Sequence, residues 1–94
     1  MFNTENEDRF FKMLSLAPDL KRFWNEKERT PQMKSIQIAL TRMDEEESAL
    51  LRFFVSVWFG TADMSDFDFI KSVKVMDEQA RKIIRKWLVD PFFC

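Results

Sequence analysis

The chain has 94 residues and a skewed composition, with eleven Phe and three Trp but no His, no Tyr, one Gly and one Cys. This length suits one domain with one core and excludes a catalytic domain joined to a separate substrate domain. Without His, the chain lacks an imidazole base, a His-supported nucleophile and the usual zinc ligand sets, and its net charge of −1 gives no overall attraction to nucleic acid or anionic lipid.

Cysteine usage and the N-terminal residues together predict a cytoplasmic protein. The single cysteine, Cys94, cannot form an intrachain disulfide, which favours a reducing compartment. The first residues are acidic and polar, unlike a secretory signal. The most apolar stretch, residues 49–59, is interrupted by Arg52 and is shorter than the roughly twenty residues of a membrane span. We therefore expect no membrane partner.

The first half of the chain predicts three helices. Thr4 and Glu7 have the spacing of a capping box and begin the first helix, which ends before Pro18. Pro18 suits the first turn of a short second helix over about residues 18–27. Thr30 and Pro31 repeat this start signal for a third helix, whose apolar side chains recur at intervals of three and four: Met33, Ile36, Ala39, Leu40 and Met43.

Residues 45–59 predict the central helix of the domain. Asp44 and Glu47 form a second capping pair, and Gly60, the only glycine, suits a left-handed C-cap. Apolar side chains cover most of the helix and leave only a narrow polar stripe, so other elements must surround it. We expect an all-α domain over residues 1–94, in which five or six short helices form a compact bundle around this central apolar helix.

The last third of the chain predicts two further helices. Ser65 and Asp68 can cap the first of these, although the alternating apolar residues over 67–75 leave a strand as the alternative. Asp77 caps the final helix, which Pro91 ends. Apolar residues form one face of the final helix and basic residues the opposite face.

The surplus of aromatic residues near loops and chain ends predicts a binding role. Most aromatic residues must be core, but Phe2, Trp24, Phe92 and Phe93 lie near termini or loops, and residues 1–4 and 91–94 are expected to be flexible or docking tails. Trp24, Phe92 and Phe93 are candidate anchors for a protein partner or a second copy of the chain, with folding back onto the domain as the alternative. Charged residues that would orient the partner are Arg81, Arg85 and Lys86.

The basic residues of the last two helices suggest nucleic acid as an alternative partner. The turn at Met76 and Asp77 between two helices resembles a helix-turn-helix, whose second helix would offer its cations to phosphates or bases. The candidate residues are Lys71, Lys74, Arg81, Lys82, Arg85 and Lys86. A solvated outer face of a core helix has the same pattern, and the overall acidity of the chain favours that interpretation.

No pattern in the sequence predicts a cofactor or a metal. One glycine cannot supply a glycine-rich phosphate loop. Asp63, Asp66 and Asp68 are spaced like cation ligands, but the loop lacks the glycine and the final acid of a calcium loop, so capping and solvation explain them better. We therefore expect no catalytic residues and no enzyme.

The C-terminal part of the chain resembles a group of small bacterial proteins. The matching residues are Phe67-Asp68-Phe69, Met76-Asp77, Arg81, Ile84 and the run from Trp87 to Phe92. They resemble the ends of uncharacterised accessory proteins that plasmids, integrative elements and phages carry. The resemblance implies a bacterial cytoplasmic setting and a regulatory or host-interfering role, without catalytic residues. We expect a non-enzymatic protein-binding adaptor, inhibitor or regulator, with a helix-turn-helix regulator and a structural homodimer as alternatives.

Overall fold

The computed structural model describes residues 4–61 and 67–93. Helices make up 71% of the structure, and the strands in this part of the chain form one two-stranded sheet. The all-α prediction is therefore confirmed. In chain order the elements are α1 (Thr4–Leu14), the 3-10 helix η1 (Pro18–Phe23), β1 (Trp24–Asn25), β2 (Thr30–Pro31), α2 (Met33–Arg42), α3 (Glu45–Phe59), α4 (Phe69–Val75) and α5 (Glu78–Val89).

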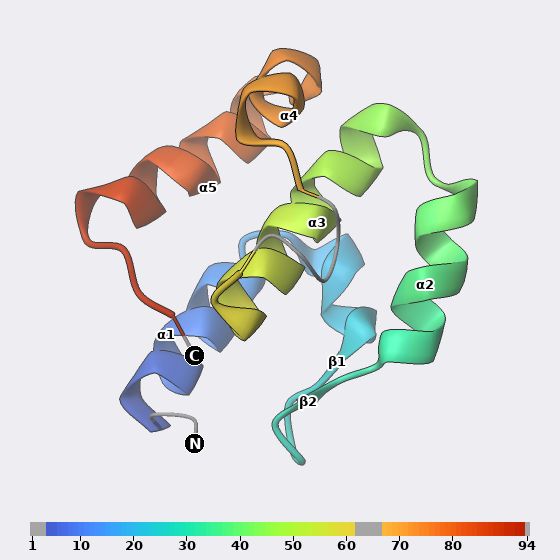
Figure 1. The fold of residues 1–94 in the computed structure, drawn as a ribbon. Helices are drawn as coiled ribbons and strands as arrows, with labels where there is room; N and C mark the ends of the chain where they lie inside the picture. Colours follow the sequence, from blue (N-terminus) through green and yellow to red (C-terminus); the bar gives the residue numbers. More distant parts are fainter. Residues whose placement is uncertain (1–3, 62–66, 94) are drawn as a thin grey trace.

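Helix α3 lies at the centre of the fold, as predicted. Figure 1 shows it between α1 and α5 on one side and α2 on the other. The Asp44 side chain accepts a hydrogen bond of 2.8 Å from the backbone N–H of Glu47, and Gly60 ends the helix with a φ of 70°. Local hydrogen bonds thus fix both ends of α3, while its apolar surface provides the faces on which the other helices pack.

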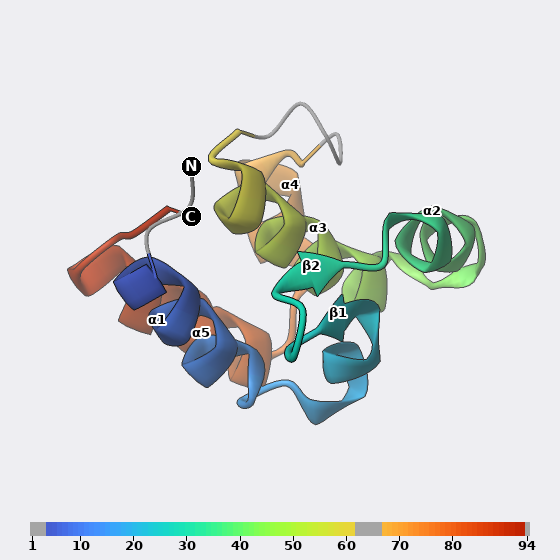
Figure 2. The same cartoon turned by 90° about the horizontal axis from the view of Figure 1, so that it is seen from below.

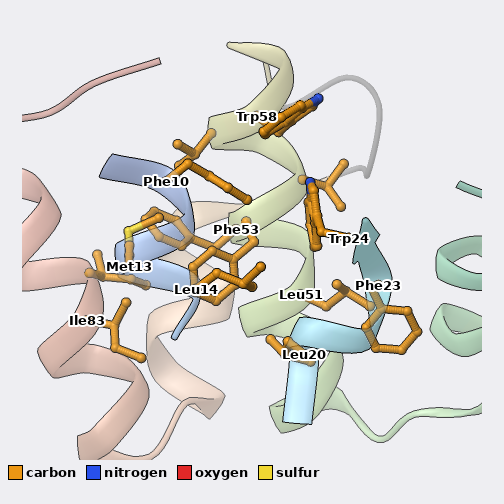
Figure 3. Packing of buried hydrophobic residues seen from close by; sticks show 14 of the residues in the cluster. Phe10, Met13, Leu14, Leu20, Phe23, Trp24, Leu51, Phe53, Trp58 and Ile83 are labelled. Atoms are coloured by element: carbon orange, nitrogen blue, oxygen red, sulfur yellow. The ribbon is translucent and has the colours of Figure 1, made fainter. Parts of the chain in front are cut away.

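An aromatic cluster joins α1, β1 and α3. The ring centroid of Phe10 lies 5.1 Å from that of Trp24 and 5.0 Å from that of Trp58 (Figure 3). Trp24 is only 5% exposed. The prediction that Trp24 is an exposed partner anchor is therefore wrong. Its indole is enclosed by other aromatic rings, whose mutual packing stabilises the core.

Residues 24–31 form a small hairpin where a helix end, a loop and a helix start were expected. Trp24 pairs with Pro31 and Asn25 with Thr30 in an antiparallel register, and Figure 2 shows this hairpin at the near side of the fold. The Asn25 side chain accepts a hydrogen bond of 3.0 Å from the backbone N–H of Glu28. This side-chain contact stabilises a turn, because Asn competes for backbone hydrogen bonds that a helix would use. Helix α2 consequently begins only at Met33.

Arg29 fastens the hairpin turn to α1. It adopts a left-handed backbone conformation with a φ of 58°. Its Nη2 lies 2.8 Å from Asp8 Oδ1, and its guanidinium carbon lies 5.3 Å from the centroid of the Phe11 ring. These contacts with α1 offset the conformational cost of a non-glycine residue with positive φ.

The ambiguous segment after residue 66 is helical. Asp68 caps α4 by accepting a hydrogen bond from the Lys71 backbone N–H at 3.0 Å, and Asp77 caps α5 in the same way from Ala80 at 2.8 Å. The predicted helix is therefore confirmed, and the strand alternative for this segment is wrong. Ser65, the other predicted cap residue, lies outside the described residues. None of the helices within 4–61 and 67–93 has both the length and the apolar character needed to cross a bilayer.

Candidate functional site

The C-terminal segment lies against α1 and α5. Phe92 is 8% exposed, and its backbone carbonyl accepts a hydrogen bond of 3.0 Å from Nε1 of Trp87. The carbonyl of Phe93 accepts a hydrogen bond of 2.7 Å from the side chain of Asn6 on α1. The prediction that Phe92 is an exposed anchor is therefore wrong, and this residue of the predicted flexible or docking tail 91–94 is buried against the domain. The alternative, folding back, is what the structure shows, because burying the Phe92 ring removes apolar surface from water.

Phe93 is the predicted anchor that remains accessible. Its side chain is half-exposed, and its ring packs edge-on against that of Trp87 with a centroid distance of 5.5 Å. The neighbouring last turn of α5 also exposes Leu88 and Val89, and residue Val89 is 86% exposed. Apolar surface therefore accumulates at the C-terminal end of α5. Phe2 and Cys94 lie outside the described residues.

A groove separates α1 from α5, and we refer to it as the α1–α5 groove. Its volume is about 350 Å³. The α1 side contributes Arg9, Lys12, Met13 and Leu16, and the α5 side contributes Ile83, Lys86, Trp87 and Asp90, with Phe92 at one end. Within the helices, the residues of each set are spaced by three and four, which places Arg9, Lys12 and Met13 on one face of α1 and Ile83, Lys86 and Trp87 on one face of α5. Leu16 and Asp90 lie just beyond the ends of these helices. In Figure 1 α1 lies at the lower left and α5 at the upper left of the molecule.

The floor of the α1–α5 groove is apolar and its rim is mainly cationic. Met13, Ile83 and Phe92 are buried beneath it, and Trp87 is half-buried. The cationic side chains at the rim are Arg9, Lys12 and Lys86, and the acidic one is Asp90. The groove therefore combines apolar contact area with positive charge, in a protein whose net charge is −1.

Arg9 contacts both the rim of the α1–α5 groove, at Asp90, and its floor, at Phe92. Its Nη2 donates to both the backbone carbonyl and the carboxylate of Asp90, each at 2.9 Å. Its guanidinium carbon lies 4.6 Å from the centroid of the Phe92 ring. The Arg9 guanidinium thus contacts three groups of the C-terminal segment: the Asp90 backbone carbonyl, the Asp90 carboxylate and the Phe92 ring.

Only one of the three predicted orienting residues lines the α1–α5 groove. Lys86 does so, whereas Arg85 forms an ion pair of 3.0 Å with Glu78 on its own helix. Arg81 donates from Nε to the carbonyl of Val73 at 3.0 Å and so fastens α5 to the end of α4. Arg81 therefore has a structural partner within the chain.

Sequence reasoning missed the contribution of the first helix. Arg9 and Lys12 were not candidates, although Arg9, Lys12, Met13 and Leu16 share one helical face in the sequence. This amphipathic spacing could have identified the four residues as one surface of the first helix. That the surface lines a groove depends on α5 lying opposite it, which the local sequence of α1 does not show.

The candidate nucleic-acid residues lie on two helices. Lys71 and Lys74 are exposed on α4, and Arg81, Lys82, Arg85 and Lys86 are exposed on α5. The N-terminus of α5 carries Asp77 and Glu78. In a helix-turn-helix this is the end that approaches the bases, so two carboxylates there would face phosphates of the same charge.

Within the described part of the chain, no group of three or more Cys, Asp and Glu side chains could hold a metal ion. Asp68 is the helix cap described above, while Asp63 and Asp66 lie outside this part. The sequence matches no family model, and neither the curated proteins nor the solved structures include a significant match. The function is therefore argued from the α1–α5 groove itself.

Proposed function

We propose that the protein is a small, non-enzymatic cytosolic module that binds another protein as an adaptor, inhibitor or regulator. The observation that supports this proposal is the α1–α5 groove, with its apolar floor and cationic rim. Partner-binding surfaces combine a desolvated apolar centre with a polar rim, and aromatic and Arg side chains are enriched in them. Trp87, Phe92 and Arg9 provide this combination.

The mechanism is occlusion of a partner surface. An apolar side chain of the partner contacts the floor, which supplies binding energy, while Arg9, Lys12 and Lys86 orient the partner and exclude surfaces of the same charge. Inhibition of a host or defence complex is one form of this proposal, consistent with the resemblance to accessory proteins of bacterial mobile elements.

Two other functions lead to different experimental outcomes. A DNA-binding regulator would use the exposed cations of α4 and α5 and would depend on nucleic acid for recovery of its partner. A structural homodimer would use the exposed apolar side chains, which include Phe69 and Ile70 on α4 and Ile38 on α2.

Site-specific photo-crosslinking tests the proposal. A photoreactive amino acid replaces Leu16 at the mouth of the α1–α5 groove, and a matched protein carries it at Ile38, which is exposed on α2. Both proteins are irradiated in lysate of the native host, one half of which is treated with nuclease while the other half is left untreated. We expect the Leu16 probe to capture one protein in stoichiometric amount and the Ile38 probe to capture little.

Three results would contradict this proposal. Equal capture by the Leu16 and Ile38 probes would exclude the α1–α5 groove as the binding site. Capture of a second copy of the chain would favour the homodimer. Capture that disappears only after nuclease treatment would favour the nucleic-acid alternative.

A further inference from the structure

The size of the α1–α5 groove limits what can enter it. Its volume of about 350 Å³ is near the lower end of the roughly 300–1,000 Å³ that ligand sites span. An apolar floor of this size suits one large side chain, with the backbone that carries it remaining outside the groove. The occupant is then a segment that presents a single apolar anchor.

The charges at the rim determine what must flank that anchor. Lys12 and Lys86 stand on opposite sides of the α1–α5 groove, and both side chains are exposed. Neither ammonium group forms an ion pair with any residue that the structure describes. Two cations without partners beside an apolar surface attract carboxylates and repel basic segments.

Asp90 shows that the α1–α5 groove already accommodates a carboxylate. This residue is the C-cap of α5, where the helix dipole disfavours negative charge, and the pairing with Arg9 at 2.9 Å offsets that cost. The Asp90 side chain is nevertheless 79% exposed. An exposed ion pair is weak, so a carboxylate from outside can compete for the same guanidinium.

We propose that the α1–α5 groove binds an acidic amphipathic segment of a protein partner. One large apolar side chain of that segment contacts Trp87 and Phe92, and its flanking carboxylates pair with Lys12, Lys86 and Arg9. Asp90 competes with the segment for Arg9. This inference rests on the proposed protein-binding function and specifies the chemistry of the partner.

The test begins with a selection from a display library of short random peptides on the purified protein. We expect the enriched peptides to contain an aromatic or large aliphatic residue flanked by Asp and Glu. Fluorescence anisotropy then measures the affinity of the most enriched peptide for each variant. Replacing its acidic residues with Gln or Lys should progressively abolish binding.

Charge variants of the protein give opposite expected effects. The double variant Lys12→Glu/Lys86→Glu should bind the peptide about tenfold more weakly or worse, because both rim cations become anions. Asp90→Asn should bind about two- to fivefold more tightly, since it releases Arg9 from an exposed ion pair while the backbone contact remains. Lys27→Glu/Lys34→Glu, a double reversal of exposed lysines outside the groove lining, is the matched control and should bind as the unmodified protein does.

Several results would overturn the inference. In the selection, these are enrichment of neutral or basic peptides, or no enrichment at all. In the affinity measurements, they are equal effects of the two double variants, or displacement of the peptide by duplex DNA, which would mean that the cations bind phosphates. If the Leu16 probe still captured a protein from lysate in any of these cases, the protein-binding function would stand and only the acidic chemistry would fail.

Discussion

The indole Nε1 of Trp87 donates a hydrogen bond of 3.0 Å to the backbone carbonyl of Phe92, across the turn that follows α5. This bond directs the C-terminal segment back over the domain instead of away from it. The Phe92 ring then lies buried under the guanidinium of Arg9. Phe92 is therefore part of the core and forms one end of the α1–α5 groove.

Substitution of Phe92 should destabilise the fold. Phe92→Ala is expected to lower the free energy of unfolding by about 3 kcal/mol, because a buried ring leaves a cavity when truncated. Phe93→Ala, at the half-exposed neighbour, is the control and should cost about 1 kcal/mol. Urea denaturation monitored by circular dichroism measures both. Removal of residues 92–94 without a change in the unfolding midpoint would refute a core role for this segment.

A separate prediction concerns the contribution of the Trp24 indole to stability. Trp24→Ala should cost about 3–5 kcal/mol, a large fraction of the total stability of a domain of this size. Trp24→Phe should cost much less, because it keeps an aromatic ring in the cluster while it removes a buried Nε1 donor that has no acceptor among the described residues. Thermal unfolding checks both, with the exposed Ile38→Ala as control. Equal losses for Trp24→Phe and Trp24→Ala would contradict this account.

A further prediction concerns the positive φ of Gly60 at the end of α3. Gly60→Ala is expected to cost about 1–2 kcal/mol, since an L-residue is strained at a φ of 70°. Steric conflict contributes little, because the nearest atom to an added Cβ is Phe93 Cβ at 3.8 Å. Gly60→Asn should cost less than Gly60→Ala, because Asn tolerates the left-handed conformation better. The reverse order in chemical denaturation would show that contacts, and not φ, decide this position.

Two substitutions of Arg29 distinguish the effect of backbone strain from that of side-chain contacts in the hairpin turn. Arg29→Ala loses the ion pair with Asp8 and retains a φ of 58°. Arg29→Gly loses the same contacts but adopts that φ without strain, so it should be more stable than Arg29→Ala by about 1 kcal/mol. Differential scanning calorimetry measures this difference. A less stable glycine variant would mean that the turn changes its conformation once the Asp8 contact is lost.

Helix capping by Asp77 gives the last prediction. Asp77→Ala should lower stability by about 1 kcal/mol, because the Ala80 backbone N–H loses its acceptor at 2.8 Å. Asp77→Asn should retain most of the stability, since its amide oxygen can accept the same bond. The exposed neighbour Gln79 provides the control substitution Gln79→Ala. A similar loss for all three variants in urea denaturation would exclude a specific capping role.

The helices with strong end signals were predictable from the sequence. Asp44 and Gly60 bound α3, and Asp77 caps α5, each through contacts between residues that are near neighbours in the chain. Such hydrogen bonds depend on local sequence alone, which explains why these predictions are confirmed. The hairpin at residues 24–31 was not predicted, because its two-residue strands are too short to produce an alternating pattern.

The sequence by itself determined the helical class and the central position of α3. Only the tertiary structure decided which aromatic side chains are buried and which cations surround the α1–α5 groove. Arg9 and Asp90 are separated by 81 positions in the chain, yet they meet at 2.9 Å. Caps arise from short-range hydrogen bonds, whereas the burial of Trp24 and Phe92 and the pairing of α1 with α5 depend on packing over the whole core.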